Sequence, residues 1–102
     1  MLNQMVLVGR IAKEPILKEI EGKKISLLSI SVPRNYKNSN GEYETDFINI
    51  RLFGNVAENT AEYCKVGDTV GIKGRVENNN ESLEIIAEKV TFLAEGKGKE
   101  VL

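Results

Sequence analysis

Residues Phe47–Phe53 (FINIRLF) set the architecture of the chain, because their side chains alternate strictly between two kinds. Successive side chains of a β-strand point to opposite faces. Ile48, Ile50 and Leu52 therefore share one face, which is wholly apolar and belongs in a core. The opposite face carries Phe47, Asn49, Arg51 and Phe53. The pattern predicts a strand with one buried side and one exposed side that mixes aromatic, amide and guanidinium groups.

The period of the pattern changes directly after this strand. Asn55 is the expected N-cap of a short helix, and Gly67 is expected to end that helix with a left-handed conformation. A 3.6-residue period places four side chains on one stripe of the helix: Val56, Thr60, Tyr63 and Cys64.

Four further segments are predicted as strands by their apolar pattern: 5–11 with a continuation at 16–20, 25–32, 69–77 and 83–93. Pro15 is expected to break the first of them and Pro33 to end the second. The polar segment 35–46 contains Asn40-Gly41, a strong turn signal, and is predicted to project as a loop. Residues 78–80, three asparagines, are predicted as the last turn.

Five strands with one short helix between the third and the fourth form the element order of the oligonucleotide/oligosaccharide-binding (OB) fold, a five-stranded Greek-key barrel. We therefore predict one all-β OB-fold domain over residues 1–94 and a frayed tail over 95–102. Other small β-barrels can mimic this element order.

The composition restricts the chemistry that the chain can perform. Its 102 residues include no histidine and one cysteine, so the usual neutral-pH acid–base group is missing and an intrachain disulfide is excluded. Cys64 is expected to be a reduced thiol near the end of the helix. No carboxylate cluster has the spacing of a calcium loop or a catalytic pair. We expect a protein that is not an enzyme and that needs no metal or other cofactor.

The net charge of −1 means that a nucleic-acid binder of this composition must concentrate its cations on one face. The exposed side of the 47–53 strand suits a single strand, because rings stack on bases while Arg51 meets a phosphate or stacks as well. Ser29 and Ser31 on the preceding strand leave room for a base. Further basic and aromatic candidates are Lys73 and Arg75 in the 69–77 strand, and Arg34, Tyr36, Lys37 and Tyr43 in and beside the polar loop.

Each candidate also has a plainer interpretation. Phe53 could pack under the helix as a core residue, and Phe47 could be a cross-strand packing partner. Arg51 could belong to a surface ion pair. The strand cations could be a solvated face, and the loop could be a soluble hairpin tip.

Met5, Val6, Leu7 and Val8 place apolar side chains on both faces of the first strand. One face can enter the core, and the other needs cover. Our preferred interpretation is a second subunit that covers it by edge pairing or sheet packing. Burial under the chain's own tail is the alternative.

A series of motifs resembles the bacterial single-stranded DNA-binding protein family from about Asn3 to Leu93. The opening Asn3–Ile11 and the following Glu14-Pro15 resemble the family's first strand and turn. The most specific stretch is 51–58 (RLFGNVAE), followed by Tyr63 and by 65–68 (KVGD), and 72–75 (IKGR) resembles the fourth-strand motif.

This resemblance implies sequence-tolerant binding of single-stranded DNA in replication, recombination or repair, usually by a homotetramer with contacts through the first strand. The family's stacking aromatics match Tyr36, Phe47 and Phe53, although tryptophan is common at the first two and this chain has none. Residues 77–80 (ENNN) replace an aromatic with basic neighbours, and the connection to the fifth strand is short. The family's Gly/Gln/Pro-rich tail with an acidic end, which recruits replication or repair proteins, has no counterpart here.

A dimeric OB-fold adaptor of the replication-restart type, which mainly contacts other proteins, is the alternative function. An enzyme such as a nuclease is disfavoured by the missing histidine. The apolar run Met5–Val8 is interrupted by Gly9 and Arg10, and it is too short for a signal peptide or a membrane span. We therefore expect a cytoplasmic protein without membrane association.

Overall fold

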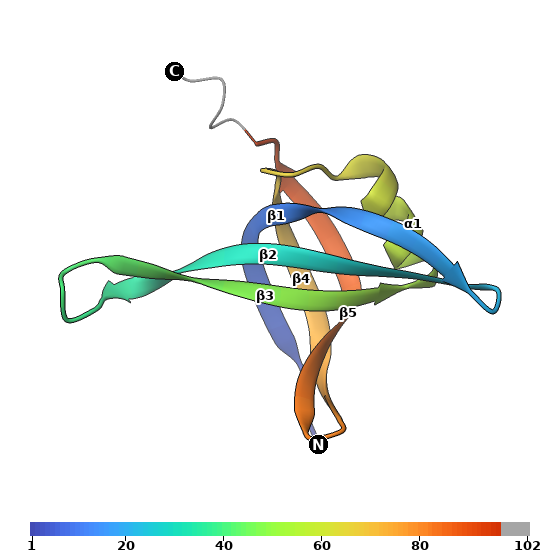
Figure 1. The fold of residues 1–102 in the computed structure, drawn as a ribbon, viewed down its shortest axis with the longest axis horizontal. Coiled ribbons are helices and arrows are strands. Elements are labelled where there is room, and N and C mark those ends of the chain that lie inside the picture. The colour runs from blue at the N-terminus through green and yellow to red at the C-terminus, as the bar shows by residue number, and fades with distance from the viewer. Residues whose placement is uncertain (97–102) are drawn as a thin grey trace.

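The computed structural model describes residues 1–96 and shows a closed five-stranded barrel with one helix (Figure 1). The elements of the described chain are β1 Met5–Ile20, β2 Lys23–Lys37, β3 Tyr43–Phe53, α1 Gly54–Tyr63, β4 Thr69–Asn79 and β5 Ser82–Ala94. The strand order is β1-β2-β3-β5-β4, and pairing of β4 with β1 closes the barrel. Only β3 and β5 pair in parallel among these elements. The predicted fold class and the position of the helix are confirmed.

The core is formed by the inward faces of the strands. Ile50 and Leu52 of β3 are fully buried, as the alternation predicts, and Ile48 packs against the edge of the same cluster. The other large, fully buried side chains are Ile11, Leu28, Ile30, Val70 and Ile72. Burial of each such side chain stabilises the fold by roughly 1.5–3 kcal/mol, so the barrel is a packed core and the site must lie on its outside.

β1 is one continuous strand, and the break predicted at Pro15 is wrong. Residues 5–10 pair with β4, whereas residues 10–20 pair with β2. Two register shifts fall between Ile11 and Ile16. Such bulges bend a strand and interrupt its ladder, and they are among the few places in a sheet where a proline is tolerated. β1 thereby curves around the barrel from one neighbour to the other (Figure 1).

β2 and β3 extend beyond the barrel as a two-stranded arm of residues 33–45, which points to the left in Figure 1. The predicted end of β2 at Pro33 is wrong, since the strand continues to Lys37. Pro33 lies beyond Ser31, the last β2 residue that pairs with β1 in the described chain. An edge of this kind tolerates proline, because no neighbouring strand needs its missing N–H.

The loop predicted over 35–46 is therefore mostly strand, and only residues 38–42 form its turn. Gly41 takes a positive φ of 79° there, so the Asn40-Gly41 turn is confirmed. The Asn38 backbone N–H donates to the carbonyl of Glu42 at 2.8 Å and closes the turn.

α1 begins earlier than predicted. Gly54, with a φ of 61°, turns the chain at the end of β3, and Phe53 is the N-cap in extended conformation without a side-chain cap. Asn55 therefore lies inside the first turn and does not cap the helix. At the other end, the extended residue Cys64 is the C-cap, and Gly67 (φ 95°) lies in the turn that follows.

The buried side of α1 differs from the predicted stripe at two residues. Thr60 and Cys64 are buried and Val56 is half-buried against the core, as expected. Tyr63 is mostly exposed, and Ala57 is fully buried instead. The helix packs this side against β1, β2, β3 and β5.

The β4–β5 hairpin is longer than predicted. Its last pair is Asn79 with Ser82, so the turn consists of Asn80 and Glu81. Both take positive φ values, 53° and 69°, which asparagine tolerates better than most residues. The predicted turn at 78–80 is therefore displaced toward the C-terminus.

Asp68 holds the end of β5 against the turn that precedes β4. Its buried carboxylate accepts hydrogen bonds from the backbone N–H groups of Lys65 at 2.8 Å and of Gly96 at 3.0 Å. The start of the predicted tail is thus bonded to the barrel. The remainder of that tail, 97–102, lies outside the described residues.

We predict that Gly74→Ala destabilises the barrel. A Cβ at Gly74 would overlap the carbonyl oxygen of Ile86 on β5, so the two strands would have to separate. We expect a loss of about 1–3 kcal/mol, which lowers Tm by roughly 4–8 °C per kcal/mol in a domain of this size, measured by thermal unfolding. Gly71→Ala is the control, since its Cβ would meet Leu93 at an ordinary 3.5 Å. Equal stability of the two variants would contradict the close approach.

Candidate nucleic-acid interface

The predicted row on β3 faces outward. Phe47 is 69% exposed and Phe53 is 40% exposed, and Asn49 and Arg51 between them are exposed as well. Phe53 ends β3 directly before α1, yet it is not a core residue. The strand therefore presents two rings with an amide and a guanidinium between them.

Each of these four β3 residues begins a row of strand partners that crosses β2 and reaches β1. The register gives Phe47–Ser31–Arg10, Asn49–Ser29–Lys13, Arg51–Leu27–Ile16 and Phe53–Ile25–Lys18. Directly opposed side chains of neighbouring strands lie on the same face of a sheet. Each aromatic row therefore ends in a cation of β1. We call the surface formed by these four rows the groove face.

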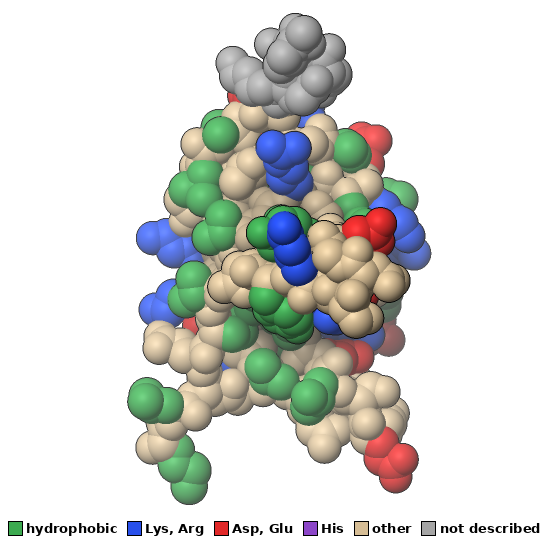
Figure 2. Space-filling model, turned by 90° about the vertical axis from the view of Figure 1, so that its left-hand side faces the viewer, with side chains coloured by type: hydrophobic (Ala, Val, Ile, Leu, Met, Phe, Trp, Pro, Cys, Tyr) green, Lys and Arg blue, Asp and Glu red, His purple; other side chains and the backbone are tan. Residues whose placement is uncertain are grey.

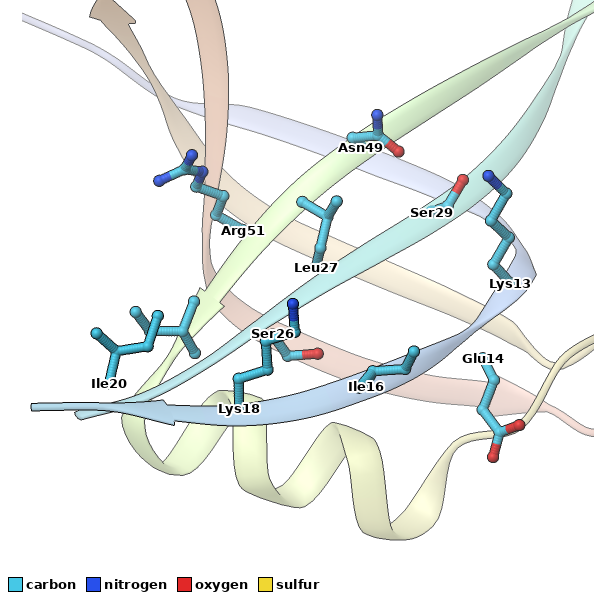
Figure 3. A pocket seen from close by; sticks show the side chains of 11 residues that line it. Lys13, Glu14, Ile16, Lys18, Ile20, Ser26, Leu27, Ser29, Asn49 and Arg51 are labelled. Carbon is cyan, nitrogen blue, oxygen red and sulfur yellow. The ribbon is translucent and has the colours of Figure 1, made fainter. Parts of the chain in front are cut away.

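The middle of the groove face is concave. An open groove of about 580 Å³ is lined by the Asn49 and Arg51 rows together with Lys18, Ile25 and neighbouring residues (Figure 3). Leu27 and Ile16 leave large apolar surfaces exposed in it. Lys13, Lys18 and Arg51 line the groove with one carboxylate, that of Glu14. An apolar floor with an excess of cations suits a flat aromatic ligand that carries negative charge, such as a nucleotide.

The β1 cations of this face were missed by the sequence analysis. Arg10, Lys13 and Lys18 all pair into the four rows, although their spacing does not follow strict alternation. The two bulges of β1 change which positions face outward. The only signal in the sequence was Pro15, which marks the irregular region without giving its register.

Arg51 and Arg75 are already paired with carboxylates. Arg51 Nη2 lies 3.3 Å from Glu84 Oε2. Arg75 contacts Glu77 at 2.8 Å and Glu88 at 3.4 Å. The hydrogen bond to Glu77 is the main cause that raises the pKa of Arg75 above its ordinary value. A phosphate that binds here has to compete with an existing partner.

The two cations predicted on β4 lie in different surroundings. Arg75 and Arg51 are the strand partners of the same β5 residue, Ile86, so Arg75 is level with Arg51 on the far side of β5. Lys73 instead pairs with Val6 of β1. The structure therefore brings Arg75 near the predicted site and places Lys73 beside the apolar surface of β1.

The arm carries the remaining predicted candidates. Tyr36 and Tyr43 are largely exposed, and Lys37 is exposed beside them. Lys37 Nζ lies 5.7 Å from the centre of the Tyr43 ring, and Arg34 Cζ lies 6.0 Å from that of Tyr36. Both distances fall within the range of cation–π attraction. Figure 2 looks onto the end of the arm, where basic and hydrophobic side chains lie side by side.

The predicted oligomer interface on β1 is half covered. Met5 and Leu7 are half-buried, and Leu7 packs against the core. Val6 and Val8 are 70% and 53% exposed. Gly71 lies between Val8 and Leu93, which is also exposed, so the apolar surface extends over β4 to β5.

Residues 1–96 contain no group of three His, Cys, Asp or Glu side chains that could hold a metal ion. No helix in this part of the chain is both long enough and apolar enough to cross a membrane. Cys64 is a free, buried cysteine, and its burial raises the pKa of the thiol. A buried thiol of this kind is poorly reactive.

Comparisons with known proteins agree with this geometry. Single-stranded DNA-binding protein B of Bacillus subtilis is 38% identical, over 91% of this chain and 91% of that protein. Single-stranded DNA-binding protein 1 of Clostridium acetobutylicum is also 38% identical, over 90% of this chain and 94% of the relative. The crystal structure of the wild-type single-stranded DNA binding protein from Thermus aquaticus shares the fold, with a TM-score of 0.78 at 23% identity over 95% of this chain and 52% of that one. The model of the single-strand binding protein family matches residues 2–93, and the chain belongs to that family.

Proposed function

We propose that the protein binds single-stranded DNA along the groove face and holds it without chemical change. The observation that carries this proposal is the set of four cross-strand rows, with Phe47 and Phe53 at the β3 margin and Arg10 and Lys18 at the β1 margin. When a base stacks on an aromatic ring of β3, the phosphate of the same nucleotide would lie toward β1. The family match and the names of the relatives support the same function.

Stacking supplies most of the affinity in this proposal. A base stacked on an aromatic side chain contributes about 1–3 kcal/mol, and every base has a face that can stack. Phe47 and Phe53 on the groove face, with Tyr36 and Tyr43 on the arm, are the exposed rings available for this purpose. Binding by these rings tolerates any sequence.

Phosphate contacts add a second contribution, which salt weakens. Arg10, Lys13 and Lys18 on β1 and Lys37 on the arm form no ion pair in the described chain, so they are available to phosphates. Arg51 and Arg75 contribute less, because each must exchange a carboxylate for a phosphate. Asn49 carries no charge and can offer a phosphate only a hydrogen bond. Lys73 contributes at a distance from the groove.

Assembly follows from the uncovered surface of β1. Val6 and Val8 would be buried by a second copy of the chain. We propose a homotetramer, with a dimer as the smaller alternative, that acts in the cytoplasm in replication, recombination or repair. An oligomer would place several groove faces on one DNA strand and strengthen binding through multivalency.

A protein-binding adaptor is the second candidate. The observation that favours it is the pairing of Arg34, Arg51 and Arg75 with carboxylates, which reduces the positive potential of the surface. Fluorescence anisotropy with labelled oligo-dT and a matched duplex separates the two candidates. Tight binding of the single strand alone supports the DNA-binding function, and no binding of either supports the adaptor.

We predict that Phe47→Ala and Phe53→Ala each weaken binding of oligo-dT by roughly 5- to 150-fold, because each removes one stacking ring worth about 1–3 kcal/mol. Fluorescence anisotropy titration measures the loss, and thermal unfolding checks that the barrel is intact. Tyr63→Ala is the control, since this exposed ring lies on α1 outside the groove face. Unchanged affinity in both phenylalanine variants would show that the DNA binds elsewhere.

Lys13→Gln and Lys18→Gln are expected to reduce the salt dependence of binding. For a single strand, each lost phosphate contact lowers the slope of log K against log salt concentration by about 0.7. Anisotropy titrations at four or more salt concentrations measure this slope. Lys89→Gln on β5, opposite Lys73, serves as the control and should leave it unchanged. Equal slopes in all four proteins would remove β1 from the proposed path.

We expect Val8→Asp to dissociate the oligomer, because a charge cannot be buried against an apolar partner without a large desolvation cost. Size-exclusion chromatography with light scattering measures the mass in solution. Val66→Asp is the control, since Val66 is similarly exposed in the turn before β4. An oligomer that survives Val8→Asp would place the interface away from β1.

A further inference from the structure

The arm of residues 33–45 needs its own source of rigidity. In the described chain the two strands of the arm pair only with each other. An isolated two-stranded hairpin is marginally stable in water. The β2–β3 register is also irregular between Pro33 and Lys37. Backbone pairing alone is therefore a weak support for the tip of the arm, where Tyr36 and Tyr43 lie.

Arg34 spans this irregular region with all three of its side-chain nitrogens. Its Nε and Nη2 donate to the two carboxylate oxygens of Asp46 at 3.1 and 3.0 Å, and its Nη1 donates to Glu44 at 3.0 Å. A bidentate arginine–carboxylate pair is stronger and more directional than a single contact. The hydrogen bonds from Arg34 lower the pKa of Asp46, because they favour its charged form.

The hydrogen bonds continue from Glu44 to the turn. The second carboxylate oxygen of Glu44 accepts from Asn38 Nδ2 at 3.1 Å. Asn38 Oδ1 accepts from the backbone N–H groups of Asn40 and Glu42, both at 2.9 Å. We call Arg34, Asp46, Glu44 and Asn38 the arm clasp. It connects the base of the arm to its turn where the backbone ladder is irregular.

The aromatic side chains of the arm rest on this clasp. The Arg34 guanidinium lies over the Tyr36 ring, with Cζ 6.0 Å from the ring centre. Lys37 and Tyr43 are strand partners just beyond it. A displaced Arg34 would therefore leave Tyr36 without its support and loosen the pairing at the tip.

We propose that Arg34 is a positioning residue for DNA binding, which acts through Asp46 and Glu44 to hold the arm tyrosines and does not itself contact a phosphate. The proposal rests on the function proposed above, and it replaces the phosphate contact that the sequence suggests for Arg34. An arginine that moved to a phosphate would leave the carboxylate of Asp46 or Glu44 unpaired beside the DNA.

Asp46→Asn distinguishes the two roles by the sign of its effect. If Arg34 bound a phosphate, removal of a competing negative charge would strengthen the binding of oligo-dT. In a positioning role the same change loosens the clasp, and we expect affinity to fall by up to roughly fivefold, the range for one exposed ion pair. Glu58→Gln is the matched control. It removes a carboxylate that is hydrogen-bonded to Lys24 outside the groove face, at 2.6 Å, and should bind like the wild type.

Arg34→Lys and Arg34→Gln provide a second measurement. A phosphate ligand keeps its charge in the lysine variant, and the salt slope falls by about 0.7 only in the glutamine variant. A positioning arginine is lost in both, because lysine cannot form the bidentate contact with Asp46. We therefore expect equal losses of affinity and an unchanged salt slope in the two variants.

A third measurement needs no DNA. In a Tyr63→Phe background the only tyrosines are Tyr36 and Tyr43, so the near-UV circular dichroism of tyrosine reports how firmly the arm holds them. Asp46→Asn should reduce this signal while the Tm of the barrel changes little. Tighter DNA binding by Asp46→Asn, or an unchanged tyrosine signal, would overturn the positioning role. If wild-type protein bound no oligo-dT, the proposed function would fail, whereas the tyrosine signal would still test the clasp.

Discussion

The bend in β1 connects the closure of the barrel to the surface proposed to bind single-stranded DNA. Before its bulges β1 pairs with β4, and after them it pairs with β2. Without this bend β1 could pair with only one of the two strands, and the sheet would remain open with unpaired edges. The same bulges set which β1 side chains point outward, and they place Lys13 and Lys18 in line with the exposed residues of β3. One local irregularity therefore builds both the fold and the basic margin of its groove.

The fold could be predicted from the sequence where a pattern is local. The alternation in 47–53 gave the buried and exposed faces of β3, and Asn40-Gly41 gave the turn of the arm. The continuation of strands through Pro15 and Pro33 could not be predicted in this way. Whether a proline ends a strand depends on whether a neighbouring strand needs its N–H, and that neighbour is distant in sequence.

The site was only half predictable for the same reason. Its aromatic margin lies within one strand and follows a period of two. Its basic margin depends on the register of β1 against β2, which two bulges shift. The ion pair between Arg51 and Glu84 joins β3 to β5, residues that only the strand order β3-β5 brings together. A sequence shows that a cation is present, but the tertiary pairing decides whether it is available to a phosphate.

Most arginines of the site are paired with carboxylates and its lysines are not, although Arg10 forms no ion pair in the described chain and Lys24, outside the groove face, is paired with Glu58. Arg34, Arg51 and Arg75 are held by carboxylates, whereas Lys13, Lys18 and Lys37 form no ion pair in the described chain. A planar guanidinium matches a carboxylate in two contacts, while an ammonium on a flexible stem is a point charge that follows its partner. Rigid arginine pairs are suited to fixing the scaffold, and mobile lysines are suited to a DNA backbone whose position varies with the bases that stack. This division is compatible with a net charge of −1, because Lys13, Lys18 and Lys37 stay unpaired in the described chain although acidic residues balance the total.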